Sequence, residues 1–168
     1  MIYAFDTYYF DDKARTACVA FHDWADAEPA GIYVRFRNDV EVYESGEFFR
    51  RELPCILDVL AEIDLQDGDV IVVDGYVTLN DEGKLGLGGY LYRELGGRIA
   101  VIGVAKTLFN QPNSKRMALE RGGSKKPLYI TAEGMDLQEA YDNICGMHGE
   151  YRMPTLLKKM DQLSRGDE

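Results

Sequence analysis

The sequence predicts an α/β fold in which a mixed sheet, an antiparallel meander followed by parallel strands, is flanked by helices. Residues 1–36 hold three runs of β-forming residues separated by turns, whereas later segments alternate short apolar runs with apolar residues at helical spacing. The run 69–76 has four consecutive β-branched residues between Gly68 and Gly75, which is typical of a strand buried on both faces. At 168 residues the chain can form one domain, residues 1–168, with its own core.

The first three strands are predicted at 2–9, 14–21 and 31–36. Turn-forming residues separate them, so the three runs form an antiparallel meander. Asp6 falls near the middle of the first strand, where a carboxylate on a sheet surface needs a partner, a metal or water.

A helix follows the meander, because apolar residues then recur at helical spacing. These residues are Phe49, Leu53, Ile56, Leu57, Leu60 and Ile63. Pro54 either kinks this helix or marks the start of its regular part. Glu52 lies beside the apolar stripe, so it must be paired or ligating; Arg50 and Arg51 are the alternative partners.

The central strand ends at Asp74, and a second helix with Leu87 on its apolar face ends at a pair of glycines. The next apolar run, 99–105, is predicted to be parallel to the central strand because strand-helix-strand units cross over that way. Lys106 then reaches the same sheet edge as Asp74. This lysine either meets a phosphate or a transition-state oxygen, or extends into solvent. Asp74 is either a site carboxylate or a turn-capping residue.

The remaining chain is predicted to hold two strands and two helices. A short strand lies between the loop 110–114 and the turn 121–124, and 127–132 forms another. Asp136 and Glu139 have the spacing of a capping box at a helix start. Pro154 opens the last helix, and Asp161 lies on the border of its apolar face.

Composition favours a cytoplasmic protein without a membrane span. The three cysteines have no metal-binding spacing, and no signal-like or long apolar segment is present. A net charge of −10 argues against nucleic-acid binding, but one stretch of the chain is basic. It holds Lys106, Lys115, Arg116, Arg121, Lys125 and Lys126. This stretch either binds phosphates or is a solvated loop.

Asp6, Glu52 and Asp74 occupy positions that a ribonuclease H-like architecture brings to one point on its sheet. Clustered carboxylates without a nearby cation form a hard oxygen site suited to Mg²⁺ or Mn²⁺, and such an ion activates water against a phosphate. His22 and His148 are the only histidines, too few for a typical zinc hydrolase.

The sequence resembles the endonuclease V family, the deoxyinosine 3′ endonucleases. The most specific similarities are the Arg51-Glu52 pair before a proline and the run 103–106. The matching segments, in the family's order, are 6–9, 46–54, 74–76, 84–87, 102–106, 126–130 and 151–154.

This resemblance implies a ribonuclease H-like nuclease that recognises inosine and hydrolyses the second phosphodiester on its 3′ side with Mg²⁺, for which Mn²⁺ can substitute. It implies metal-binding carboxylates at Asp6, Glu52 and Asp74, and an active-site lysine at Lys106 with a late carboxylate at Asp161. The implied substrate-binding residues are the wedge aromatic Tyr43 and the positions Gly46, Phe48, Gly75 and Leu87. Taking a base out of its stack is cheapest at weakened pairs such as those of inosine.

Two classes of function stay open on the sequence. The first is a metal-dependent endonuclease on inosine-containing DNA, with RNA as the near alternative. The second is a catalytically weak nucleic-acid-binding or interaction module that retains the fold. Retention of the carboxylates and Lys106 favours the enzyme, whereas the acidic composition and the altered wedge around Tyr43 favour the module.

Overall fold

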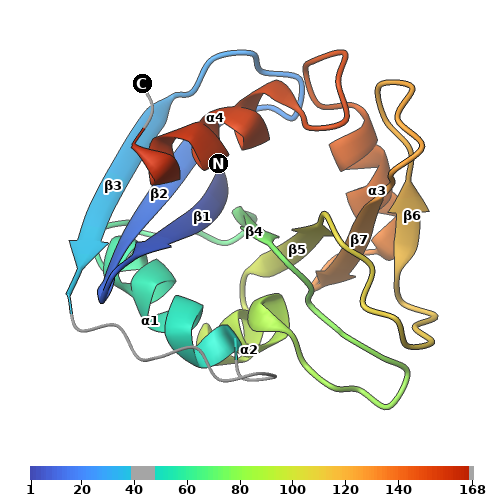
Figure 1. Ribbon diagram of the computed structural model, residues 1–168, viewed down its shortest axis with the longest axis horizontal. Coiled ribbons are helices and arrows are strands. Elements are labelled where there is room, and N and C mark those ends of the chain that lie inside the picture. The colour runs from blue at the N-terminus through green and yellow to red at the C-terminus, as the bar shows by residue number, and fades with distance from the viewer. Residues whose placement is uncertain (39–47, 167–168) are drawn as a thin grey trace.

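The computed structural model describes residues 1–38 and 48–166, in which one mixed sheet carries helices on both faces (Figure 1). The strands are β1 (Ile2–Phe10), β2 (Lys13–Phe21), β3 (Gly31–Arg37), β4 (Val70–Asp74), β5 (Ala100–Ala105), β6 (Met117–Leu119) and β7 (Leu128–Glu133). The helices are α1 (Phe48–Leu60), α2 (Leu87–Glu94), α3 (Leu137–Cys145) and α4 (Thr155–Arg165).

The strands lie in the order β3-β2-β1-β4-β5-β7-β6. β1 and β2, and β2 and β3, are antiparallel, which confirms the predicted meander. β4 is parallel to both β1 and β5, so the predicted parallel arrangement is also confirmed. β7 returns antiparallel to β5, a pairing that local residue patterns do not specify.

Alternation along the strands divides the core into two layers. On one face Ala4 and Val72 belong to a cluster completed by residues of α3 and α4. On the other face Phe5 and Val73 pack with residues of α1 and α2. The sheet is therefore covered on both faces, which accounts for the unbroken apolar character of β4.

The register of the central strands brings three chemically important positions together. Phe5 pairs with Val73, so Asp6 and Asp74 are the next residues of two parallel neighbours. Asp74 pairs with Val104, two residues before Lys106. Because side chains alternate between faces, the backbone places all three residues on the face that α4 covers.

Several local expectations are tested by these elements. Asp136 accepts a hydrogen bond of 3.3 Å from the Glu139 N–H at the start of α3, which confirms the predicted cap. Pro54 lies inside α1, which ends at Leu60, so the predicted helical position of Ile63 is wrong. Ile63 still packs against the α1 and α2 layer, so its apolar character reflects the core and not the helix. No helix in the described part of the chain is long and apolar enough to cross a membrane.

The basic stretch has a structural role at two of its arginines. Arg121 is buried and donates to the carbonyl oxygens of residues 145, 147, 149 and 151, at the end of α3 and in the connection to α4. Arg116 donates to the carbonyl oxygens of Phe109 and Gln111. Arg121 therefore fits neither alternative for the basic stretch. Its side chain is buried and its N–H groups are hydrogen-bonded to main-chain carbonyl oxygens, so it is neither part of a solvated loop nor available to a phosphate.

Candidate active site

A cavity of about 780 Å³ lies at the edge of the sheet where β4 and β5 end, and residues of β1, α1 and α4 also line it. All five predicted catalytic residues line it: Asp6, Glu52, Asp74, Lys106 and Asp161. They come from five different elements or their ends, so only the folded chain brings them together. A cavity of this size is within the usual range for small-molecule and cofactor sites.

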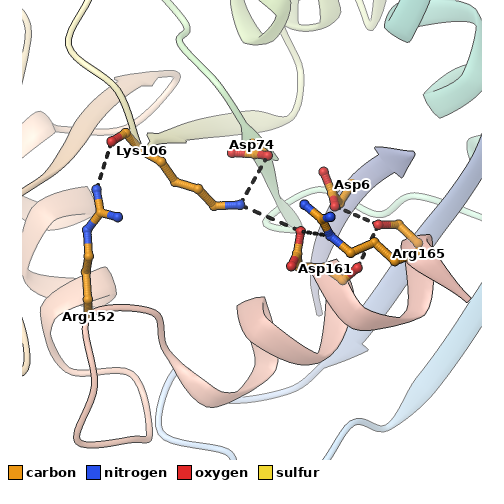
Figure 2. Close-up of polar contacts among 7 residues, drawn as sticks. Asp6, Asp74, Lys106, Arg152, Asp161 and Arg165 are labelled. Atoms are coloured by element: carbon orange, nitrogen blue, oxygen red, sulfur yellow. Dashed lines mark hydrogen bonds and ion pairs between the residues drawn. The ribbon is translucent and has the colours of Figure 1, made fainter. Parts of the chain in front are cut away.

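Lys106 lies between two carboxylates at the centre of the site, as Figure 2 shows. Its Nζ is 3.6 Å from Oδ2 of Asp74 and 3.7 Å from Oδ1 of Asp161. Asp161 also pairs with Arg165, one turn further along α4, at 3.3 Å. All these side chains keep partial contact with water, so they can exchange partners when a charged ligand enters.

Asp6 is the carboxylate that β1 presents to α4. Its Oδ2 accepts a hydrogen bond of 2.7 Å from the Ser164 hydroxyl. Burial and the nearby Asp74 charge raise the pKa of Asp6 to about 7, although the Ser164 hydrogen bond and Lys106 act in the opposite direction. Asp6 therefore retains a proton at a pH where an exposed aspartate is ionised.

Glu52 enters the site from α1 and is 8% exposed. Burial, followed by the charges of Asp74 and Asp6, holds the pKa of Glu52 well above its usual range. Arg51 lowers this pKa in part, and its guanidinium lies 3.6 Å from the ring centre of Tyr9. The sequence predicted that a carboxylate at position 52 needs a cationic partner or a metal. The burial of Glu52 beside two other carboxylates is consistent with that prediction.

Asp6, Glu52 and Asp74 fit a divalent cation by the chemistry of their donors. All three are carboxylates that line one cavity, where burial first and the neighbouring carboxylates second raise the pKa values of Asp6 and Glu52. A divalent cation there would stabilise their ionised forms. Within residues 1–38 and 48–166, however, no group of three Asp, Glu, His or Cys side chains is drawn together closely enough to hold an ion as it stands. The shared metal therefore stays a prediction.

The main chain at Lys106 is held from two sides. Arg152 donates from Nη2 to the Lys106 carbonyl oxygen at 2.8 Å (Figure 2). The same atom donates to the Pro127 carbonyl oxygen at 3.0 Å. The Tyr76 hydroxyl donates to the Thr107 carbonyl oxygen at 2.6 Å and accepts from the Phe109 N–H at 3.0 Å. These contacts hold the backbone directly after β5, from which the Lys106 side chain extends into the site.

The predicted substrate pocket is described only in part. Gly75 and Leu87 line the same cavity as the carboxylates. Gly75 has φ +147°, a backbone conformation that favours glycine. Phe48 is the first residue of α1, and its side chain is not described. Tyr43 and Gly46 lie outside the described residues.

Sequence reasoning missed several residues that shape the site. Ser164 and Arg165 lie three and four residues after Asp161 on α4. The available signal in the sequence was a serine on the apolar face of this helix, one turn after a candidate site carboxylate. Arg152 lies in a segment that resembles the family, but its hydrogen bonds to distant carbonyls are visible only in the fold. Asn80 is buried, and its side-chain oxygen accepts hydrogen bonds from the Glu82 and Lys84 N–H groups of the loop that follows it.

The fold, the carboxylates and the lysine agree with a match between residues 1–162 and the family model for endonuclease V. The chain belongs to the endonuclease V family. Membership of the endonuclease V family implies nuclease activity. No curated protein sequence matches the chain significantly.

Solved endonuclease V structures share this fold. The Streptomyces avermitilis protein is 22% identical with a TM-score of 0.75, and the alignment covers 98% of this chain and 79% of that one. Human ENDOV is 20% identical with a TM-score of 0.78, covering 98% and 82%. Ciona intestinalis endonuclease V, in complex with a 24mer DNA containing an inosine followed by a ribo-adenosine, is 16% identical with a TM-score of 0.80, covering 98% and 84%. These similarities confirm the predicted ribonuclease H-like fold.

Proposed function

We propose that this protein is a metal-dependent endonuclease that acts on inosine-containing nucleic acid and hydrolyses the second phosphodiester 3′ to the inosine, in repair of DNA. The observation that carries the proposal is the convergence of Asp6, Glu52, Asp74 and Lys106 on one cavity in an endonuclease V family chain. The Ciona relative bound to inosine-containing DNA supports the choice of substrate.

Asp6, Glu52 and Asp74 would hold Mg²⁺, or Mn²⁺ in its place. When bound, such an ion supplies Lewis-acid chemistry, because it activates water and offsets charge on the phosphate. Lys106 would place its ammonium group against the negative charge that develops on the phosphate oxygens. Its ammonium group already lies beside Asp74 and Asp161, so a bound phosphate would take the place of one of these two carboxylates as its anionic partner. The cytoplasm remains the compartment we propose, supported by three free cysteines.

Inosine would be selected after it leaves the base stack. Hypoxanthine lacks the exocyclic amine of guanine, so a close-fitting pocket lined by Gly75 and Leu87 would exclude guanine by clash and by an unpaired donor. Gly86 allows two backbone segments of the cavity wall to approach closely, because a Cβ at this position would collide with the Tyr76 carbonyl oxygen. Tyr43 is the wedge proposed to hold the gap in a duplex.

The test is cleavage of matched oligonucleotides carrying inosine, guanine or adenine at one position, with Mg²⁺ or Mn²⁺. We expect cleavage of the inosine strand well above that of the matched guanine and adenine strands, at the second phosphodiester on the 3′ side of the inosine. Tyr43→Ala should lose more activity on duplex than on single strands. Equal cleavage of the three strands would reject inosine recognition and leave a metal-dependent nuclease, whereas binding without any cleavage would favour the catalytically weak binding module.

An inosine-specific ribonuclease is the second candidate, because the DNA bound by the Ciona relative carries a ribonucleotide after the inosine. Substrates with a deoxynucleotide or a ribonucleotide directly 3′ to inosine distinguish the two. Faster cleavage of the ribonucleotide substrate would favour the ribonuclease.

Metal binding is tested separately from cleavage. Thermal melting of the metal-free protein should shift upward on addition of Mn²⁺, because an ion that binds only the folded state stabilises it. Asp74→Asn should abolish that shift, whereas Asp67→Asn, a change at a side chain that is 93% exposed, should retain it. An undiminished shift in Asp74→Asn would remove Asp74 from the proposed ligands.

A further inference from the structure

A row of aromatic and arginine side chains runs from the cavity across β1, β2 and β3 to the edge of the sheet. Tyr8 pairs with Arg15, and Arg15 pairs with Phe36, so these residues form one line across three strands. The aromatic row, as we call it, consists of Tyr8, Phe10, Arg15, Phe36 and Arg165.

Each ring of the aromatic row lies beside a guanidinium group, and two of the rings also stack on each other. The Arg15 guanidinium carbon lies 5.3 Å from the ring centre of Phe10 and 5.1 Å from that of Phe36. Arg165 lies 5.3 Å from the ring centre of Tyr8, which stacks on Phe10 at 6.4 Å. Rings that stack bases and arginines that attract phosphates are the two components of a surface for single-stranded nucleic acid.

The aromatic row is continuous with the candidate active site. Tyr8 and Arg165 line the cavity, so one end of the row is part of its wall. The other end is Phe36, which is 64% exposed on the edge strand β3. Three strands span about 10 Å at the usual separation of neighbouring strands. A strand of nucleic acid with one phosphate at Lys106 would therefore meet the row directly beside the cavity.

The charge of the aromatic row suits the same ligand. Arg165 shares its charge with Asp161, but Arg15 makes no salt bridge among the described residues. Its hydrogen bond goes to the Ser164 carbonyl oxygen at 3.3 Å, so the positive charge of Arg15 remains uncompensated by a carboxylate there. On a chain with a net charge of −10, a cationic aromatic surface next to the cavity is a local exception.

We propose that the aromatic row binds the single-stranded part of the substrate that adjoins the cavity, by base stacking and phosphate attraction without sequence preference. The inference rests on the proposed function for the identity of the cleaved substrate. It adds a surface for the flanking nucleotides, with Phe36 as its outermost ring.

The experiment measures the binding of fluorescently labelled single-stranded oligonucleotides to the full chain in EDTA, so that no cleavage occurs. Unmodified and inosine-containing oligonucleotides are extended stepwise on the 5′ side or on the 3′ side. The wild-type protein should gain affinity with length on one side, with or without inosine. Phe36→Ala should weaken binding of the long oligonucleotides by about fivefold or more and leave the short ones unchanged.

Two further variants separate stacking from packing. Phe36→Trp should retain the dependence on length, because it keeps an aromatic face, whereas Phe36→Leu should lose it. Ile32→Ala is the matched control, since Ile32 is exposed on the same strand and lies four residues from Phe36. It should behave as the wild type.

The outcomes distinguish this inference from the proposed function. Equal affinities of wild type and Phe36→Ala at every length would overturn the inference, even if inosine is cleaved selectively. An equal loss on short and long oligonucleotides would also overturn it, because Phe36 would then act through folding or through the cavity. If the wild type is a dimer, Phe36→Ala is a monomer and the length dependence is the same in both, the row mediates self-association and the inference is overturned. A length dependence that the wild type shows and Phe36→Ala loses, together with equal cleavage of inosine, guanine and adenine strands, would support the row and reject inosine recognition.

Discussion

The Ser164 hydroxyl on α4 donates to Oδ2 of Asp6 on β1 at 2.7 Å and joins two residues that are 158 positions apart. The same hydroxyl lies 2.8 Å from the Asp161 carbonyl oxygen, and its single proton can serve only one acceptor at a time. Ser164 is fully buried and Asp6 is partly buried, so this contact links the first strand to the last helix at the wall of the cavity. The position of the Asp6 carboxylate therefore depends on how α4 docks on the sheet.

Ser164→Ala should lower both stability and activity. We expect a loss of about 1 to 2 kcal/mol in the free energy of unfolding, because a partly buried acceptor loses its donor. The pKa of Asp6 should rise further, since the hydrogen bond normally lowers it. Urea denaturation and kcat at several pH values test both effects. Ser124→Ala, a change in an exposed turn, is the matched control and should alter neither.

Lys106→Ala should lower kcat by about a hundredfold or more and leave oligonucleotide affinity nearly unchanged. The reason is that the ammonium group, facing Asp74 and Asp161, acts on charge that develops during the reaction. Single-turnover cleavage and binding in EDTA measure the two quantities. Lys115→Ala, an exposed lysine of the same basic stretch, should leave kcat unchanged. A loss confined to affinity and its salt dependence would make Lys106 a simple phosphate contact.

Arg152→Ala should lower kcat by roughly ten- to a hundredfold through displacement of Lys106. Arg152 binds the Lys106 carbonyl oxygen, and small displacements of a reacting group carry costs of this order. A double-mutant cycle identifies the cause: in the Lys106→Ala background, Arg152→Ala should reduce kcat no further. Additive losses of kcat would show that Arg152 acts independently of Lys106.

The metal-free protein should become less stable as pH rises from about 4 to about 7. An unfolded aspartate loses its proton near the ordinary pKa of 3.8, whereas folded Asp6 keeps it up to about 7. Between these values the folded state binds the extra proton, so raising the pH favours unfolding. Urea denaturation in EDTA at pH 5 and pH 7.5 measures the difference.

Asp74→Asn should reduce this pH dependence, because the Asp74 charge is, after burial, the largest cause of the raised pKa of Asp6. Some dependence should remain, since burial itself is unchanged. Asp67→Asn, at an exposed position, should leave the dependence as in the wild type. An identical slope in Asp74→Asn and wild type would contradict the electrostatic coupling of Asp6 and Asp74.

Much of the candidate site could be predicted because its residues follow regular elements. The β-branched run at β4 predicted a buried strand ending at Asp74, and the crossover rule predicted that β5 would bring Lys106 to the same edge. The resemblance to the family supplied the roles expected of Asp6, Glu52 and Asp161. All five of these residues line one cavity.

The sequence by itself determined the meander, the central parallel strands and the helix faces, because these depend on the local alternation of apolar and polar residues. The site carboxylates were expected from the resemblance to the family. Only the tertiary structure decided that β7 pairs antiparallel with β5, that Arg121 serves buried carbonyl oxygens, and that Ser164 meets Asp6. Each of these depends on contacts between distant segments, whose partners are selected by packing and by the need to satisfy buried polar groups. The alternation that places Tyr8, Arg15 and Phe36 on a common face is local, but their alignment in one row follows from the register of three paired strands.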